Sequence, residues 1–160
     1  MKKLKLYLET SVWNFVFADD APDLRDITLQ FFDLIAKGSY EIYISDIVIF
    51  EIEKTKGKKL GEMVRLIEKY NPIPLQSNQQ TQDLAKAYLD AKIVPSYKKE
   101  DALHVAVGVL EELDAVISWN FRHLANLRKS ELFHAVSVMQ GYHRKVEILT
   151  PSEVMYDEGP

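Results

Sequence analysis

Residues 41–54 read EIYISDIVIFEIEK, and this stretch decides the fold class. Glu41–Ile44 is rich in residues that favour β-structure, so it predicts a strand. Ser45 then supplies the side-chain oxygen expected at a helix N-cap, and the apolar run after it predicts a helix to about Lys54. A strand that leads directly into a helix is the building unit of a parallel sheet.

The same unit is expected on both sides of this stretch. Leu4–Leu8 predicts a strand, Thr10 and Ser11 a helix start, and Asp23–Lys37 a helix. Further helices are expected at 60–70, 77–91, 100–112 and 130–141, strands at 73–75, 115–119 and 146–149, and a final turn at 152–153. This alternation predicts an α/β fold, a single domain with a central parallel sheet flanked by helices on both faces. We expect residues 1–155 to form the domain and residues 156–160 a frayed C-terminal tail.

The composition is that of an ordinary globular protein. The 160 residues are 47% hydrophobic and 28% charged, and they include no cysteine. Disulfides, thiolate zinc sites and cysteine nucleophiles are therefore excluded. The net charge of −4 argues against a protein that coats nucleic acid through bulk positive charge. Because Lys5 and Glu9 interrupt the first apolar stretch and no apolar run approaches ~20 residues, we expect a cytoplasmic protein without a secretory signal.

Polar residues follow three of the expected strands. They are Glu9-Thr10-Ser11, Ser45-Asp46, and Ser118 with Asn120. Sites in open parallel sheets form beyond the carboxyl ends of the strands, so these residues are candidates for function. We interpret Thr10, Ser11 and Ser45 as helix caps. For Glu9, a capping or ion-paired role and a ligand role both remain open.

Two further carboxylates are expected on helices near the same edge. Glu51 lies four residues after Ile47 on a helix that is apolar nearly all round, so its charge must be paired or must bind a cation. Asp101 opens the helix at 100–112, where an aspartate commonly caps the helix or favours its dipole. Three residues later comes His104, which we interpret as a satisfied buried imidazole rather than a ligand.

Together these residues give three carboxylates from three separate elements, with the amide of Asn120 nearby. Oxygen-only ligand sets suit Mg²⁺ or Mn²⁺ rather than zinc. Such ions activate water and stabilise charge on a phosphoryl group. Carboxylates scattered along a chain do not by themselves identify a nuclease.

Four segments of the chain resemble PIN domains, especially VapC-type toxin ribonucleases. They are Leu6–Val12, Ile44–Ile52, Lys99–Ala106 and Val116–Leu124, and they follow the family's order over about residues 4–155. The resemblance implies a parallel sheet between helices. It also implies an endoribonuclease that hydrolyses RNA phosphodiester bonds with Mg²⁺ or Mn²⁺ held by acidic residues.

The resemblance also implies partners. A VapC-type chain is the toxin of a type II toxin–antitoxin pair, so an antitoxin protein and an RNA substrate are expected. The family further implies a homodimer. Apolar aromatic residues such as Phe15, Phe17 and Phe31–Phe32 exceed what one small core obviously needs, which agrees with self-association.

Position by position, the resemblance assigns the site residues. Glu9 stands where the family has its first aspartate, Glu51 and Asp101 match later acidic residues, and Asn120 stands where many members have a fourth acid. The resemblance thus implies Glu9, Glu51, Asp101 and Asn120 as catalytic residues, with Glu9, Asp101 and Glu51 as metal ligands. Glu9 and Asn120 depart from the pattern. The alternative is therefore a catalytically weakened PIN fold that binds RNA or a protein partner without cutting.

Two basic segments have open interpretations. The lysines of residues 54–59 could contact RNA phosphates, although a solvated turn is the preferred interpretation. Arg122 and His123 follow Asn120 directly and either meet a phosphate at the mouth of the site or pair and pack at the surface.

Overall fold

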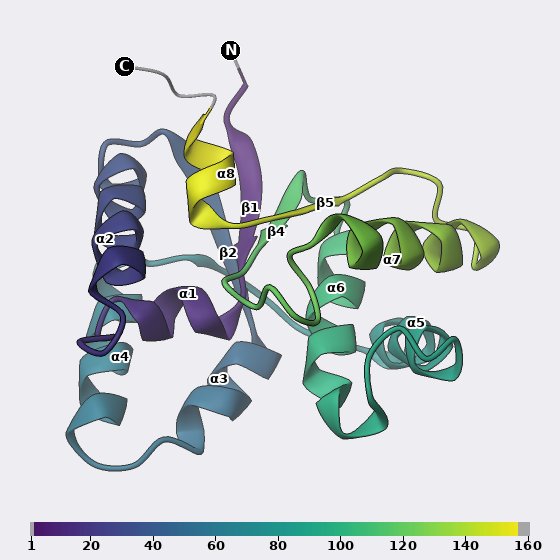
Figure 1. The fold of residues 1–160 in the computed structure, drawn as a ribbon, viewed down its shortest axis with the longest axis horizontal. Helices are drawn as coiled ribbons and strands as arrows, with labels where there is room; N and C mark the ends of the chain where they lie inside the picture. Colours follow the sequence, from purple (N-terminus) through teal and green to yellow (C-terminus); the bar gives the residue numbers. More distant parts are fainter. Residues whose placement is uncertain (1, 157–160) are drawn as a thin grey trace.

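A computed structural model describes residues 2–156. Five strands form one sheet in the spatial order β3-β2-β1-β4-β5, and every neighbouring pair is parallel (Figure 1). The strands are β1 (Leu4–Leu8), β2 (Tyr40–Ser45), β3 (Ile73–Leu75), β4 (Ala115–Ile117) and β5 (Glu147–Leu149). The prediction of an α/β fold with a central parallel sheet is confirmed.

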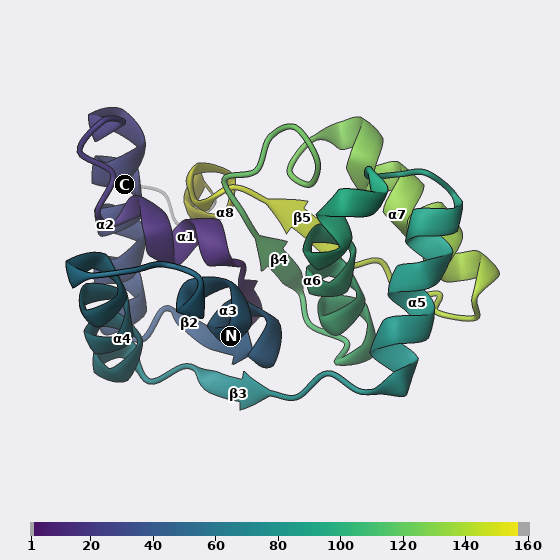
Figure 2. The same ribbon diagram turned by 90° about the horizontal axis from the view of Figure 1, so that it is seen from below.

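Helices cover both faces of this sheet. They are α1 (Thr10–Phe15), α2 (Pro22–Ala36), α3 (Asp46–Glu53), α4 (Lys58–Tyr70), α5 (Gln79–Asp90), α6 (Lys99–Leu110), α7 (Leu127–Met139) and α8 (Pro151–Tyr156), with a short 3-10 helix at Ser96–Lys98. Figure 2 shows α1, α2 and α4 on one side of the strands and α5, α6 and α7 on the other. None of the helices within residues 2–156 is long and apolar enough to cross a membrane.

Element boundaries differ from the predictions where polar side chains intervene. Helix α7 begins three residues before the expected Ser130, because the Asn126 side chain accepts a hydrogen bond from the backbone N–H of Lys129 at 2.9 Å. Strand β4 ends two residues before the expected Trp119, whose backbone N–H donates to the Ser11 hydroxyl instead. The segment after β5 was expected to be only a turn and is helix α8. The tail predicted at 156–160 lies, beyond Tyr156, outside the described residues.

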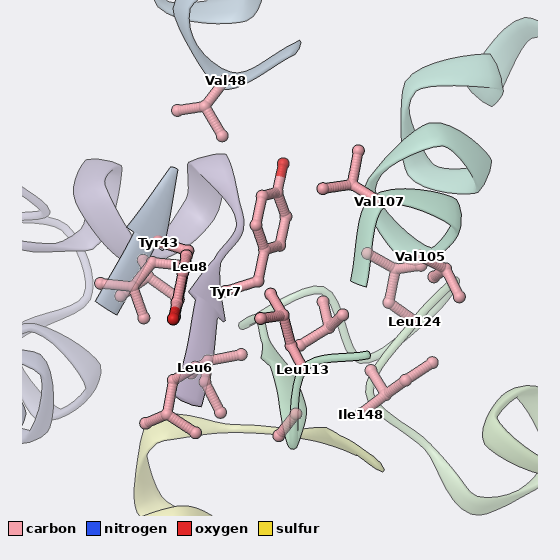
Figure 3. Packing of buried hydrophobic residues seen from close by; sticks show 14 of the residues in the cluster. Leu6, Tyr7, Leu8, Tyr43, Val48, Val105, Val107, Leu113, Leu124 and Ile148 are labelled. Carbon is pink, nitrogen blue, oxygen red and sulfur yellow. The ribbon is translucent and has the colours of Figure 1, made fainter. Parts of the chain in front are cut away.

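The core fills both faces of β1 (Figure 3). Leu6, Tyr7 and Leu8 are all fully buried, as expected for a central parallel strand with helices on either side. Phe31 and Phe32 are also buried in this core, so their number needs no second subunit to explain it.

The topology places a site at the carboxyl end of β1. From β1 the chain passes to β2 and β3 on one side, and it later returns to add β4 and β5 on the other. Ligands bind at such a reversal in open α/β sheets. Helix α6 packs closely against β4, because a Cβ atom at Gly108, in the last turn of the helix, would lie 2.6 Å from Cγ2 of Val116.

Candidate active site

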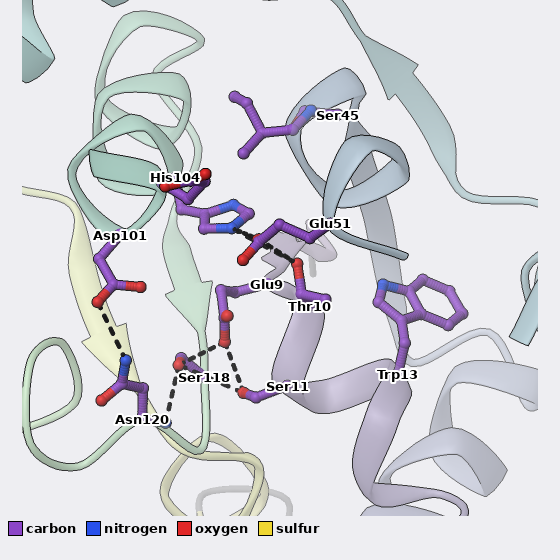
Figure 4. A network of polar contacts seen from close by, with 12 residues as sticks. Glu9, Thr10, Ser11, Trp13, Ser45, Glu51, Asp101, His104, Ser118 and Asn120 are labelled. Carbon is purple, nitrogen blue, oxygen red and sulfur yellow. Dashed lines mark hydrogen bonds and ion pairs between the residues drawn. The ribbon is translucent and has the colours of Figure 1, made fainter. Parts of the chain in front are cut away.

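The four side chains predicted to be catalytic lie around one place beyond the carboxyl end of β1 (Figure 4). Glu9 follows β1, Glu51 stands near the end of α3, Asp101 lies in the first turn of α6, and Asn120 follows β4. Glu9 and Asp101 are buried, whereas Glu51 and Asn120 are half-buried. The site is thus built at the sheet edge from four separate parts of the chain.

Glu9 is held by two serine hydroxyls. Its Oε1 accepts hydrogen bonds from Ser11 Oγ at 2.5 Å and from Ser118 Oγ at 2.6 Å. Its Oε2 accepts none from the part of the chain that the structure describes. The expectation that Thr10 and Ser11 cap α1 was wrong, because the N-cap residue is Glu9 and no side chain bonds the helix start. The hydroxyls bind carboxylates instead.

Glu51 is paired with a buried histidine. Its Oε1 accepts from Thr10 Oγ1 at 2.6 Å and lies 2.5 Å from His104 Nε2. Burial alone would raise the pKa of Glu51, but the hydrogen bond and charge of His104, with the Thr10 hydrogen bond, lower it below its ordinary value. The partner that the apolar helix required for this carboxylate is therefore an imidazole.

His104 belongs to a hydrogen-bonded chain beneath the site. Its Nδ1 lies 2.6 Å from the Tyr7 hydroxyl, which in turn lies 2.7 Å from Ser45 Oγ. Ser45 caps α3 as predicted, since its hydroxyl accepts the backbone N–H of Ile47. Burial disfavours the charged imidazole, yet the Glu51 hydrogen bond and the charges of Glu9, Glu51 and Asp101 raise the pKa of His104. This series of hydrogen bonds ties β1, α3 and α6 together.

Asp101 has no such compensation. Its Oδ2 accepts one long hydrogen bond, at 3.3 Å, from the Asn120 amide, and no cation pairs with it among residues 2–156. Burial and the charge of Glu9, with a further contribution from Glu51, raise the pKa of Asp101 to about 6, against the opposing charges of His104 and Lys98. This carboxylate is therefore the one that most needs an added positive charge.

Asn120 acts as a bridge rather than as a free ligand. Its Nδ2 donates to Asp101, and its Oδ1 accepts the backbone N–H of His123 at 3.0 Å. Both polar atoms of the amide are thus used within the protein. The geometry gives Asn120 the task of orienting Asp101.

The donor set fits a hard divalent cation. Ligand atoms of Glu9, Glu51 and His104 all lie within 4.8 Å of one another, and Asp101 stands outside this tight group. Both ring nitrogens of His104 already have partners, in Glu51 and Tyr7. The donors that remain are carboxylate oxygens of Glu9, Glu51 and Asp101, and such oxygens suit Mg²⁺ or Mn²⁺.

Several residues of the site escaped the sequence analysis as functional candidates. Thr10, Ser11 and Ser118 were noticed as polar strand ends, but their partners lie up to 109 residues away in sequence. Tyr7 gave no signal, because a tyrosine in an apolar strand is typical of a core residue. His104 is satisfied and buried, as interpreted, and its partner is a carboxylate of the site itself.

Comparison with solved structures agrees with this fold. The chain is similar to one in the crystal structure of VapBC2 from Rickettsia felis bound to a DNA fragment from their promoter, with a TM-score of 0.54. The match covers 92% of this chain and 98% of that chain at 12% sequence identity. The chain therefore has a VapC-like fold, in agreement with the PIN-like fold that the sequence resemblance implied. No protein-family model and no curated protein matches the chain.

Proposed function

We propose that this protein is a divalent-metal-dependent endoribonuclease that hydrolyses RNA phosphodiester bonds. One observation carries the proposal. Each of Glu9, Glu51 and Asp101 has one oxygen held by side-chain hydrogen bonds, while its other oxygen accepts none from the described chain. Carboxylates that are oriented on one side and free on the other are prepared to bind a cation.

Glu9, Asp101 and Glu51 would hold the ion, Mg²⁺ or Mn²⁺. When bound, such an ion supplies activation of water and neutralisation of the phosphodiester charge. The protein's own contribution is orientation: Ser11 and Ser118 fix Glu9, and the Asn120 amide fixes Asp101. His104 contributes at most one positive charge against three carboxylates, so the site retains a negative charge for a cation to balance.

A second candidate function is an RNA-binding or protein-binding PIN-like fold that does not cut. The observation that favours it is the use of both Asn120 polar atoms within the protein, which leaves no fourth ligand from this position. A site with three carboxylates and one bridging amide holds one ion more readily than two. Cleavage activity separates the two candidates.

We further propose that the protein works with partners. The similar solved structure is a VapBC2 complex bound to DNA. By analogy, this chain would be the toxin of a toxin–antitoxin pair, inhibited by a cognate antitoxin protein in the cytoplasm. The family resemblance adds a homodimer, and light scattering at micromolar concentration that gives only the monomer mass would reject it.

The decisive experiment is the rate of RNA cleavage against Mn²⁺ concentration for wild type and Asp101→Asn. We expect the variant to lose activity by roughly a thousandfold or more, because it removes a charge that compensates the ion directly. Asp114→Asn is the matched control, because Asp114 pairs with Arg144 at 2.7 Å beside the amino end of β4. A folded Asp101→Asn that cuts RNA as fast as wild type would leave only the non-catalytic candidate.

A further inference from the structure

A basic pocket adjoins the acidic site. It has a volume of about 660 Å³ and lies between the segment that links α5 to α6 and the segment that links β4 to α7. Its lining carries the cationic or titratable side chains of Lys92, Arg122, His123 and Lys129, and no aspartate or glutamate. Pockets of this charge attract anions.

The cations of this pocket lack acidic partners. Lys92, Arg122 and Lys129 form no ion pair with a carboxylate within residues 2–156, and Lys129 donates instead to the backbone carbonyl of Ile93. Burial and the positive charges of Arg122, Lys98 and Lys129 lower the pKa of His123. Positive charge concentrated without internal compensation is available for a ligand.

The lysine-rich turn at residues 54–59 differs in this respect. Lys54 pairs with Glu100 at 3.4 Å and lies over the Phe50 ring, and Lys58 lies 3.7 Å from Glu62. Part of its charge is therefore neutralised locally. The pocket is the stronger candidate for anion binding, although the turn is the more conspicuous basic segment in the sequence.

One side chain joins the pocket to the acidic site. The Asn120 side chain bridges Asp101 and the backbone of His123. The positive charge of Lys98 contributes to the pKa shifts of both Asp101 and His123. The pocket and the carboxylate Asp101 therefore share Asn120 as a neighbour.

Exposed aromatic rings flank the same region. Tyr97, which lines the pocket, is 76% exposed, and Phe121, next to Arg122, is 52% exposed. Large rings left open beside unpaired cations match the requirements of single-stranded nucleic acid, whose bases stack on aromatic faces while its phosphates meet positive charge.

We propose that this pocket binds the phosphate backbone of single-stranded RNA beside the acidic site, with Tyr97 as a stacking surface for a base. The proposal deepens the proposed ribonuclease function and rests on it for the choice of RNA. Lys92 and Arg122 contact phosphates, and Lys129 holds the pocket wall through Ile93. The strand then continues past Asn120 to the carboxylates.

The test measures binding without chemistry. A fluorescein-labelled oligouridine of about 12 nucleotides is titrated with protein in EDTA by fluorescence anisotropy over a range of salt concentrations. The variant Lys92→Ala/Arg122→Ala should bind at least about tenfold more weakly. The slope of the logarithm of the binding constant against the logarithm of the salt concentration should be shallower by about 1.4. Each phosphate that is no longer neutralised reduces this slope by about 0.7. Circular dichroism and thermal melting confirm that the variants are folded.

Matched controls locate the effect. Lys56→Ala/Lys59→Ala also removes two positive charges, but from the exposed turn. This variant should bind the oligouridine within about twofold of wild type, with an unchanged salt slope. Tyr97→Ala should weaken binding about tenfold, whereas Tyr97→Phe, which keeps the ring, should not. A duplex of the same length should bind more weakly than the single strand, because its bases cannot stack on Tyr97.

Each contrary outcome is informative. The pocket proposal is overturned if wild type does not bind the oligouridine, if the pocket variant binds as wild type does, or if the turn variant loses as much affinity. Tight binding through the pocket without Mn²⁺-dependent cleavage would keep the RNA subsite and reject the nuclease. Cleavage by wild type with no effect of the pocket variant would reject the subsite and keep the nuclease.

Discussion

The two carboxylates that accompany Glu9 stand in opposite electrostatic surroundings. Glu51 has a hydroxyl donor and a buried imidazole 2.5 Å away, and its pKa is lowered. Asp101 is buried with one long amide hydrogen bond, and its pKa is raised to about 6. One side of the site carries its own counter-charge, and the other side lacks one.

This difference separates structural from functional charge. A buried ion pair that is satisfied within the protein holds elements in place, and removing one partner exposes the cost of burying the other. A buried carboxylate without a partner destabilises the native state until something positive binds. The Glu51 side therefore acts as scaffold, and we infer that the Asp101 side is where a cation contributes most.

The largest expected effect is on the compensated side. His104→Ala should lower the free energy of unfolding by about 3–5 kcal/mol, because it leaves Glu51 without its charged partner and opens a cavity. Urea denaturation at neutral pH measures this. The control His134→Ala, at a half-buried site on α7, should change stability by about 0.5 kcal/mol or less. A small effect at His104 would remove the contrast between the two sides.

On the uncompensated side the sign should reverse. Asp101→Asn should stabilise the EDTA-treated protein by on the order of 3 kcal/mol above pH 6, since each pKa unit corresponds to about 1.4 kcal/mol. A raised carboxyl pKa gives stability that is present below about pH 4 and lost as pH rises through about 6.

The gain of Asp101→Asn should therefore vanish in acid, and denaturation curves between about pH 3.5 and 8 test this. Asp114→Asn, which breaks an ion pair with Arg144, should show no gain at any pH. An Asp101→Asn protein that is less stable than wild type at neutral pH would mean that Asp101 already has a counter-charge.

A bound divalent ion should give Asp101 the counter-charge that Glu51 already has in His104. Millimolar Mg²⁺ or Mn²⁺ should stabilise wild type at neutral pH by about 2.7 kcal/mol when its concentration is a hundred times the dissociation constant. The same ions should give little gain to Asp101→Asn. Thermal melts with and without the ion measure both, and identical melting temperatures for wild type would count against a prepared cation site.

The smallest expected effect concerns two buried tyrosine hydroxyls, only one of which contacts His104. Tyr7→Phe and Tyr88→Phe each remove a buried hydroxyl that meets a serine, Ser45 in one case and Ser137 in the other. Both should cost about 1 kcal/mol of stability. Only Tyr7→Phe should also slow Mn²⁺-dependent cleavage, because only Tyr7 reaches His104. Equal cleavage rates for the two variants would show that this chain of hydrogen bonds does not support the site.

Sequence patterns predicted the architecture more completely than they predicted the contacts within the site. Alternating strands and helices predicted the parallel sheet, and Ser45 was correctly expected as a cap, because these features depend on neighbours in the chain. The partners of Thr10 and Ser11 depend on which distant residues the fold brings near. Spacing along the chain contains no such information, so both hydroxyls were assigned to the nearest helix.

The same limit applies to charge. Residue types predicted that Glu51 needed a partner, yet nothing near it in sequence identified His104, 53 residues later. The family resemblance implied from its position that Asn120 is a catalytic residue, whereas the fold uses both ends of its amide within the protein. Burial and pairing decide these roles, and both follow from the strand order rather than from the local pattern.

The strand order also has a consequence for the timing of synthesis. Strand β1 is synthesised first, whereas its neighbour β4 is the last but one of the strands to be synthesised. Ser118, whose hydroxyl donates to Glu9, is synthesised 109 residues after Glu9. A ribosome that has released only the first half of the chain has produced Glu9 and Glu51 without Asp101, His104 or Ser118. The acidic site therefore cannot assemble on a partly made chain. Any activity of the site can therefore begin only when translation of the protein is nearly complete.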